Sequence, residues 1–367
     1  MSSITAIGIS NPVHRFNQSV LADFMERAMS LNKDDARKLK TIFKASGIQF
    51  RHSVLEDYGK QTDFSFYTNT KDLSPFPSTE LRLKLFHENA LTLSVSAIKN
   101  LRVSFPFFDD KKITHLISVC CTGMYAPGLD IELVKTLGLP STTQRTSINF
   151  MGCYAAFNAL KIADAVCKSN PEAQVLIVCT ELCSLHFQRE ATDDNMLANA
   201  LFADGAAAVL VQANSNHQIR LKLKSFHNDL ATEGEQAMAW TIGNLGFEMK
   251  LSSYVPDIIR NGIRKLTITL LDKVEKQISD IRYFAIHPGG KKILEAIEGE
   301  LGITPEQNTE AYHVLKNYGN MSSPTVLFVL KYILEKLKTE DHGEHILSFA
   351  FGPGLTLESM VLEIEAQ

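Results

Sequence analysis

The 367-residue chain lacks any run of about 18 consecutive apolar residues, so its sequence predicts no membrane span. It also lacks a basic leader: the first ten residues reach Asn11-Pro12 quickly, and we read them as a first strand rather than a signal peptide. Neither sign of charge is in excess, because the formal net charge is only −4, which argues against a nucleic-acid partner. These absences predict a globular protein of the cytoplasm.

Cysteine is missing from most of the chain, since all six residues lie between Cys120 and Cys183. Their apolar surroundings predict reduced thiols rather than disulfides. Cys179, Cys183 and His186 have a loosely zinc-like spacing, but Cys179 ends an apolar run and no fourth ligand is apparent. We therefore predict no metal site.

One cysteine stands at the start of a helical pattern. Cys153 follows Gly152 and leads into an apolar helix, where unsatisfied backbone N–H groups favour a thiolate. His287 and Asn320 recur later in similar apolar, glycine-bordered settings. Each has a purely structural alternative: a small core residue for the cysteine, a histidine bonded to a backbone carbonyl, and an asparagine that caps a helix. Together, one nucleophile and two hydrogen-bond donors would make a catalytic site.

Strand-like runs alternate with helical patterns, and the order of elements repeats. The runs 113–119 and 281–286 are each followed by a Gly/Pro turn and a helix, over 129–137 and 291–301. A later helix start is followed by a strand in both halves, over 174–179 and 345–349. Equivalent glycines lie 164 residues apart, and Cys153 and Asn320 lie 167 residues apart. Unless this order is a coincidence among α/β segments, it predicts two pseudo-duplicated halves, 1–213 and 214–367, with a shared central cleft.

Two segments fall outside the repeat. Residues 61–77 are polar, turn-rich and aromatic, and they predict an excursion on the surface. Residues 186–199 predict a loop with a short helix near a dimer or active-site face.

Five motifs in matching order link the chain to a known family. They are Gly152-Cys153, Leu201 to Ala207, Phe284 to Gly290, Tyr318 to Pro324 and Phe351 to Leu355. On these the sequence resembles the type III polyketide synthases, the chalcone-synthase-like branch of the thiolase superfamily, over nearly its whole length. The resemblance implies an α/β fold, the thiolase-like layered α/β/α/β/α arrangement, and a homodimer.

The resemblance also implies a Cys-His-Asn triad of Cys153, His287 and Asn320. Cys153 as a thiolate, with His287 as an imidazolium that lowers its pKa, would attack an acyl-CoA starter. His287 and Asn320 would stabilise the enolate left by decarboxylation of malonyl-CoA. The expected reaction is a decarboxylative Claisen condensation, iterated and cyclised to a pyrone, resorcinol or phloroglucinol. CoA thioesters are substrates here, and no cofactor is expected.

Further positions carry over from the family by motif. Phe202 matches one residue of an aromatic gate, and we choose Phe247 as the second, with Met249 as the alternative. Gly352, Pro353 and Gly354 would shape the cyclisation pocket, because a missing Cβ lets backbone approach substrate. Lys40 and Lys44 would contact the CoA phosphates, unless they belong to a solvated helix face.

The chain departs from the plant enzymes where starter specificity resides. Cys121 and Thr122 replace a Thr-Ser pair, Ala126 replaces a larger residue, and His186 replaces a common Thr, while Ser322 either lines the site or caps a helix. These changes predict an aliphatic rather than a phenolic starter, and the small Ala126 predicts room for a longer chain.

Two other functions fit less well. A ketoacyl-acyl-carrier-protein synthase of the third kind would perform one condensation, but that family usually has Gln-Ala-Asn after its histidine, where this chain has Pro288-Gly289-Gly290. A non-catalytic partner subunit is unexpected while all three triad residues are present.

Overall fold

The computed structural model describes residues 2–215, 217–252 and 254–366. Within these ranges nine strands form one sheet in the order β11-β12-β13-β8-β1-β7-β6-β4-β5. The bounds are β1 Ser3–Ser10, β4 His115–Cys120, β5 Gln144–Asn149, β6 Gln174–Leu182, β7 Asp204–Gln212, β8 Ile219–Leu230, β11 Tyr283–Ile286, β12 His345–Gly352 and β13 Thr356–Ala366. Two separate two-stranded ribbons pair β2 (His14–Asn17) with β3 (Phe50–Ser53) and β9 (Met238–Gly243) with β10 (Gly246–Leu251).

The strand order confirms the internal repeat. Outward from the centre of the sheet, β1-β7-β6-β4 on one side corresponds to β8-β13-β12-β11 on the other. In both series the first two pairs of neighbouring strands are antiparallel and the third pair is parallel. The predicted boundary between residues 213 and 214 lies in the connection from β7 to β8.

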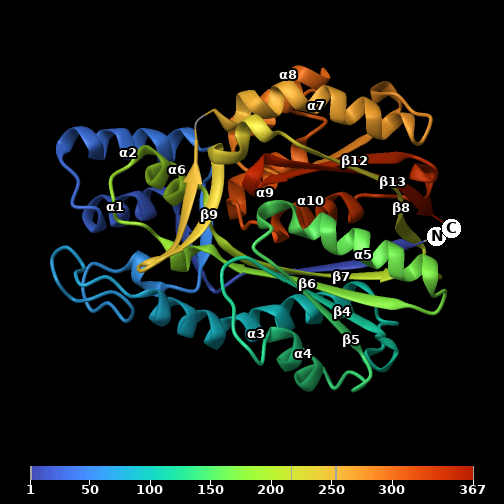
Figure 1. Ribbon diagram of the computed structural model, residues 1–367, viewed down its shortest axis with the longest axis horizontal. Coiled ribbons are helices and arrows are strands. Elements are labelled where there is room, and N and C mark those ends of the chain that lie inside the picture. The colour runs from blue at the N-terminus through green and yellow to red at the C-terminus, as the bar shows by residue number, and fades with distance from the viewer. Residues whose placement is uncertain (1, 216, 253, 367) are drawn as a thin grey trace.

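Helices lie in three layers around the two halves of the sheet (Figure 1). Helices α7 (Val255–Asp272) and α8 (Lys291–Leu301) cover one outer face, and α3 (Thr79–Ser104) and α4 (Leu129–Leu137) cover the other. Between the halves lie α5 (Ala155–Ser169) and α10 (Pro324–Leu334). The remaining helices are α1 Gln18–Ala28, α2 Lys33–Ala45, α6 Asp193–Leu201 and α9 Thr309–Tyr318. The predicted α/β/α/β/α layering is therefore observed.

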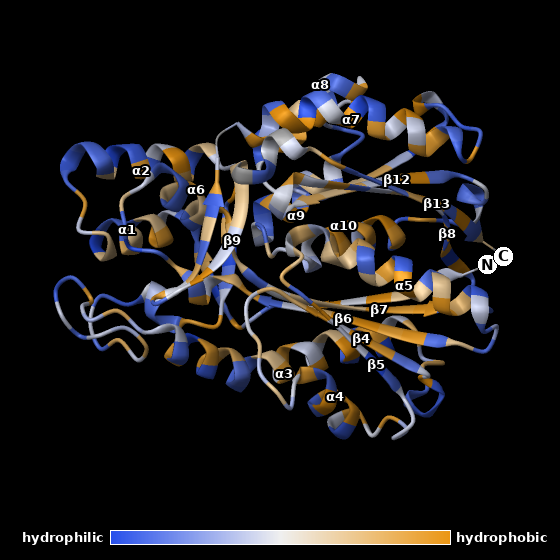
Figure 2. Ribbon diagram, in the orientation of Figure 1, coloured by the Kyte–Doolittle hydropathy of each residue, from blue (hydrophilic) through white to orange (hydrophobic). Residues whose placement is uncertain are grey.

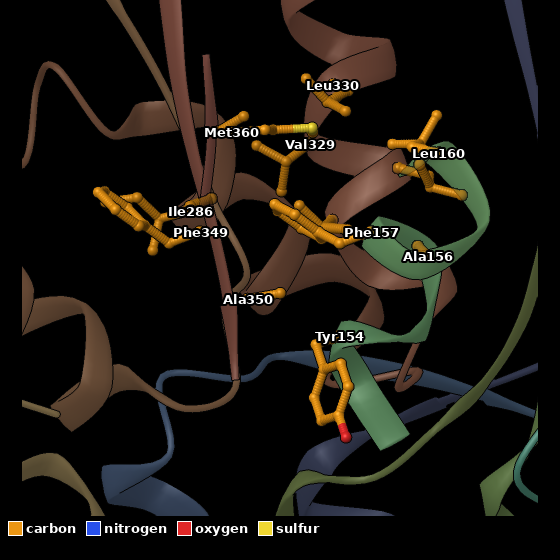
Figure 3. Packing of buried hydrophobic residues seen from close by; sticks show 14 of the residues in the cluster. Tyr154, Ala156, Phe157, Leu160, Ile286, Val329, Leu330, Phe349, Ala350 and Met360 are labelled. Carbon is orange, nitrogen blue, oxygen red and sulfur yellow. The ribbon is translucent and has the colours of Figure 1, made fainter. Parts of the chain in front are cut away.

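The central helix α10 is apolar because its first two turns are covered on all sides. The stretch 324–330 of α10 is fully buried, and Figure 2 shows this helix mostly in hydrophobic colours, whereas α7 and α8 alternate between the two. Figure 3 shows Phe157 of α5 beside Val329 of α10, on the side of β12 to which Ala350 points. This packing fixes the starts of α5 and α10 at the same level between the two halves.

Helix ends agree with the sequence more closely than strand ends do. Helices α4 and α8 have the predicted bounds, and both end at a glycine with a left-handed φ, 62° at Gly138 and 71° at Gly302. Strands β6 and β12 each continue three residues beyond the predicted 174–179 and 345–349.

Residues 61–77 contain no strand or helix, but they are not simply a surface excursion. Phe64, Tyr67 and Phe76 are buried, and Tyr67 and Phe76 pack against Phe187. Among the described residues, no helix is long and apolar enough to cross a membrane.

Candidate active site

Cys153 sits in a single 3₁₀ turn, Gly152–Tyr154, that runs directly into α5. The turn starts at Gly152 with φ of 73°, and a Cβ there would lie 2.2 Å from Cδ of Pro353. Only glycine fits this conformation and this contact. The predicted helix-start position of Cys153 is therefore observed, one turn ahead of the α-helix.

The Asn320 side chain faces the thiol in a fixed orientation. Its Oδ1 accepts a hydrogen bond of 2.8 Å from the backbone N–H of Ser322 and lies 3.8 Å from Cys153 Sγ. Its Nδ2 lies 3.9 Å from Sγ and donates to Gly289 O at 3.3 Å. The backbone of Asn320 is bound on both sides, to Leu201 and Ala203. Asn320 does not cap α10, because Ser323 holds that position and the helix begins at Pro324. The helix-cap alternative is thus wrong.

His287 follows the last residue of β11, and its backbone N–H donates to Phe349 at 2.8 Å. Within the described parts of the chain, neither ring nitrogen of this buried histidine has a hydrogen-bond partner. The alternative of a ring bonded to a carbonyl is therefore wrong. A buried polar ring without a partner is costly, and such groups are often kept for a ligand or a reaction.

Cys153, His287 and Asn320 line one cavity. All three are buried, at 7%, 1% and 3% exposure. Burial raises the pKa of the Cys153 thiol to about 12 and lowers the pKa of His287 to about 3. The expected resting imidazolium next to a thiolate is thus not supported, because desolvation outweighs the helix-start effect. Proton transfer from the thiol to the ring would create both charges together and leave the cavity with no net charge.

A carboxylate that sequence reasoning missed lies beside the triad. Glu181 of β6 is fully buried, and it accepts hydrogen bonds from the Cys121 N–H, the Thr122 hydroxyl and the Ser323 hydroxyl, at 2.8–2.9 Å. Burial raises its pKa to about 7. Since Ser323 belongs to the second half of the chain, Glu181 joins both halves at the cavity. A charged residue inside the apolar run 175–183 was the available signal.

The structure corrects the choice of gate residues. Phe202 lines the cavity as predicted, but Phe247 does not: its ring stacks on His186 at 4.2 Å and is 1% exposed. Met249, the alternative, lines the cavity instead. Side chains alternate along β10, so Phe247 and Met249 share a face and differ in depth.

Other predicted pocket residues separate into two groups. Cys121, Thr122, Ser322 and Pro353 line the triad cavity, and His186 lines an adjoining one. Ala126 is exposed and lies outside both cavities, so within one chain it cannot set starter length. Gly352 and Gly354 are also outside: a Cβ at Gly352 would meet the Tyr154 ring at 2.5 Å, and one at Gly354 would meet nothing within 4 Å. Gly352 thus serves packing of β12 on the Cys153 turn rather than approach to substrate.

A groove leads outward from the triad cavity and shares Leu251, Gly289 and Ile293 with it. Its cations are Lys38, Lys291 and Lys292. The predicted Lys40 and Lys44 do not line it, and Lys40 pairs with Asp23 and Glu26 at 3.3 and 2.6 Å on the other side of α2. Helix α2 therefore contributes Lys38 to the groove, whereas Lys40 and Lys44 lie outside it.

A duplicated α/β fold with a thiol, an amide and an imidazole between its halves defines a thiolase-like condensing enzyme. The sequence matches the family described as chalcone and stilbene synthases, with its N-terminal domain over residues 1–215 and its C-terminal domain over residues 222–365. The chain therefore belongs to this family, the type III polyketide synthases.

Relatives agree with this assignment. The chain is 31% identical, over 98% of its length and 91% of the relative's, to the "alpha-pyrone synthesis polyketide synthase-like Pks18" of Mycobacterium tuberculosis. It is 33% identical to the "probable polyketide synthase 1" of Dictyostelium discoideum, of which it spans only 11%. It is 29% identical to a "putative chalcone synthase" of Bacillus subtilis over 99% of that protein.

Solved structures give the same fold. The C-terminal type III polyketide synthase domain of Steely1 from Dictyostelium superposes with a TM-score of 0.90 at 32% identity, covering 99% of both chains. The PKS-I structure from the brown alga Ectocarpus siliculosus gives 0.92 at 29% identity, covering 99% of this chain and 98% of that one.

Proposed function

We propose that this chain condenses malonyl-CoA with an aliphatic acyl-CoA starter by decarboxylative Claisen chemistry, repeatedly, and releases a cyclised product of the pyrone, resorcinol or phloroglucinol type. The observation that carries the proposal is the meeting of Cys153, Asn320 and an unpartnered His287 in one buried cavity. Each of the three has an open bonding position toward that space.

Loading begins with the buried thiol. As Cys153 Sγ attacks the starter thioester, its proton passes to the free ring nitrogen of His287. The carbon–sulfur bond to CoA then breaks, and the departing thiolate takes the proton back from the ring. The neutral resting ring suits this base role, since burial lowers the pKa of His287.

Extension uses the His287 ring and the Asn320 amide to stabilise the negative charge of an enolate. When malonyl-CoA loses CO₂, the electron pair of the broken carbon–carbon bond moves onto the thioester oxygen as an enolate. His287 N–H and Asn320 Nδ2–H can both donate to that oxygen. The enolate carbon then attacks the acyl thioester on Cys153, a new carbon–carbon bond forms, and the cysteine sulfur leaves.

Satisfied polar groups in the cavity support an aliphatic starter. The Thr122 hydroxyl donates to Glu181 and accepts from Leu182 N–H. His186 uses both ring nitrogens, one toward Thr122 O at 2.7 Å and one toward Phe247 N–H at 3.0 Å. Neither group is left to bind the hydroxyl of a phenolic starter.

The groove beyond Leu251 and Gly289 suits the CoA portion. Lys38, Lys291 and Lys292 supply positive charge for phosphates, while Ile42, Val255 and Ile293 supply apolar walls for the pantetheine arm. We assign CoA contacts to these lysines in place of Lys40 and Lys44.

Product analysis tests the proposal as a whole. The purified protein is incubated with malonyl-CoA and a panel of acyl-CoA starters, and the products are identified by mass. We expect CoA release and products that carry two or more added two-carbon units, with aliphatic starters preferred over coumaroyl-CoA. A product limited to one added two-carbon unit would favour the alternative of a single-condensation enzyme. The absence of any product would favour the alternative of a non-catalytic partner subunit.

We also propose that the chain acts as a homodimer. Among the described residues, strand β5 lies at the edge of the sheet and pairs on one side only, and its residues 144–147 are exposed. Met124, which follows β4 in the sequence, is also 41% exposed. An uncovered strand edge is normally protected, and pairing with a second copy is one way to protect it. Light scattering on the eluting protein is expected to give twice the chain mass at micromolar concentration, and a single-chain mass there would contradict the dimer.

A further inference from the structure

Three of the six cysteines of the chain line the triad cavity. They are Cys121, Cys153 and Cys183, and all six cysteines are free thiols. The proposed reaction uses only the thiol of Cys153. Two further thiols therefore lie beside the nucleophile without an assigned task.

Cys121 is the thiol that is held against the Cys153 turn. Its Sγ accepts a hydrogen bond of 3.0 Å from the backbone N–H of Gly152, the residue directly before Cys153. Neighbouring α-carbons are about 3.8 Å apart, and disulfides join α-carbons up to about 6.8 Å apart. A sulfur in contact with Gly152 is thus within reach of the Cys153 side chain.

The backbone of Cys121 is anchored on both sides. Its N–H donates to Glu181 Oε2 at 2.9 Å, and its carbonyl oxygen accepts the indole N–H of Trp240 at 2.9 Å. These two bonds come from β6 and β9, and they fix the strand end that carries the Cys121 side chain. The sulfur is therefore presented to the Cys153 turn by a rigid frame.

Cys183 is placed differently. It opens the turn Cys183–His186 after β6, and it lines the adjoining cavity as well as the triad cavity. Part of its surface therefore faces a space that Cys153 does not line. Of the two additional thiols, Cys121 is the one whose sulfur contacts the segment that carries the nucleophile.

We propose that Cys121 is a resolving thiol, and that it forms a reversible disulfide with Cys153 when a peroxide oxidises the nucleophile. The disulfide removes the free sulfur that acyl loading needs, and it protects that sulfur from further oxidation. Condensation then stops under oxidising conditions and resumes after reduction by a dithiol. This regulation goes beyond the proposed function and assigns a task to a cavity thiol that the condensation does not use.

Two steps account for every atom. In the first, Cys153 Sγ attacks one oxygen of hydrogen peroxide and its proton passes to the His287 ring. The O–O bond breaks, the departing hydroxide takes the proton as water, and Cys153 is left as a sulfenic acid. In the second, Cys121 Sγ attacks the Cys153 sulfur and the S–O bond breaks. The second hydroxide leaves with the Cys121 proton as water, and the disulfide is formed.

The surroundings of the two thiols set this order. Burial, and then the nearby Glu181 carboxylate, raise the pKa of Cys121 well above its ordinary value, so this residue is a protonated thiol at rest. Cys153 is also buried, but it shares its cavity with the His287 ring, which has no hydrogen-bond partner among the described residues and can take the proton. Oxidation is therefore expected to begin at Cys153.

The test treats the reduced wild-type protein with hydrogen peroxide, removes the excess with catalase, and follows intact mass, peptide maps and acyl loading. We expect the loss of two hydrogens, a cross-linked pair of peptides that contains Cys121 and Cys153, and loss of loading. Dithiothreitol is expected to restore most of the loading. A cross-link from Cys153 to any other cysteine, or loss of loading without a cross-link, overturns the inference.

Variants identify the resolving thiol, each compared with its own untreated sample. In Cys121→Ala the sulfenic acid has no partner and proceeds to the sulfinic acid, which dithiothreitol does not reduce. Its recovered fraction of loading is therefore expected to be at least about five-fold below that of wild type. Cys183→Ala and Cys167→Ala are the matched controls and are expected to recover like wild type. Equal recovery in Cys121→Ala contradicts the assignment.

Substrate protection gives a readout that needs no variant. Wild-type protein loaded with hexanoyl-CoA, without malonyl-CoA, carries a thioester on the Cys153 sulfur. Peroxide is then expected to leave the acyl mass in place and to produce no cross-link. A full cross-link on acylated protein shows that the disulfide does not involve Cys153 and overturns the inference. Failure of the reduced protein to load any acyl-CoA contradicts the proposed function instead, and the peptide map still decides whether the disulfide forms.

Discussion

Cys153→Ala is expected to abolish acyl loading completely, seen as loss of the starter's mass shift on the intact protein. Cys153 is the cysteine whose sulfur lies within 3.9 Å of the Asn320 amide group, in the cavity that also holds the His287 ring. Without a sulfur there, the acyl group has no attachment point that a base can activate. Extension should fall to the background rate with every starter.

Two neighbouring thiols make this a demanding test. Cys121 and Cys183 also line the cavity, but burial raises the pKa of both well above the ordinary value, and Cys121 Sγ already accepts the Gly152 N–H at 3.0 Å. We expect neither to become acylated in Cys153→Ala. Peptide mapping that finds the acyl group on either one would refute the assignment of the nucleophile.

Cys167→Ala is the matched control. Cys167 lies on α5, the same helix that Cys153 precedes, but it is buried in the core and lines neither cavity. This variant should load starter like the wild type. A similar loss in both variants would indicate damage to α5 rather than removal of a nucleophile.

Sequence periodicity was sufficient to predict the duplicated halves, whereas the order of the layers came from the resemblance to the family. Repeating strand, turn and helix patterns predicted the duplicated halves, because each buried strand needs a continuous apolar run and each outer helix needs one apolar stripe. The ends of α4 and α8 were predictable to the residue, since a glycine at a left-handed φ stops a helix with little ambiguity. The order of Cys153, His287 and Asn320 in that framework then brought them to one cleft.

Side-chain direction was harder to predict. Lys38 and Lys40 are two residues apart on α2 and point to nearly opposite sides, so an error of that size moves a lysine from the groove to Asp23 and Glu26. Phe247 and Met249 share one face of β10, but Phe247 stacks on His186 and only Met249 of the two lines the triad cavity.

The sequence pattern gives little indication of the contacts that Trp240 and Glu181 make. Trp240 lies in a ribbon with no repeat counterpart, and its contact with Cys121 joins residues 119 positions apart in sequence. Glu181 reads as one polar residue at the end of a strand, and its three donors come from two distant segments. Contacts of this kind depend on tertiary packing, which a local pattern does not contain.

Asn320→Ala is expected to lower malonyl-CoA decarboxylation by about a hundred- to a thousand-fold, the usual effect of losing one oxyanion donor. Starter loading on Cys153 should continue, because that step uses the thiol and the His287 ring. The two steps can be measured separately, by acetyl-CoA formation from malonyl-CoA alone and by intact mass with starter alone. Loss of both would point to a collapsed cavity instead of a missing donor.

Asn320→Asp separates the donor from the scaffold. An aspartate keeps an Oδ1 that can accept the Ser322 N–H at 2.8 Å, so the local turn is retained, but it presents an oxygen where Nδ2 faced Cys153. If Asn320 acts by donating to the enolate, this variant must decarboxylate no better than Asn320→Ala, because a carboxylate repels the developing charge. His287→Ala provides the contrast: it removes the base as well as a donor and is expected to lose loading and decarboxylation together. Decarboxylation near the wild-type rate in Asn320→Asp would mean that the amide only holds the turn, and that His287 stabilises the enolate without it.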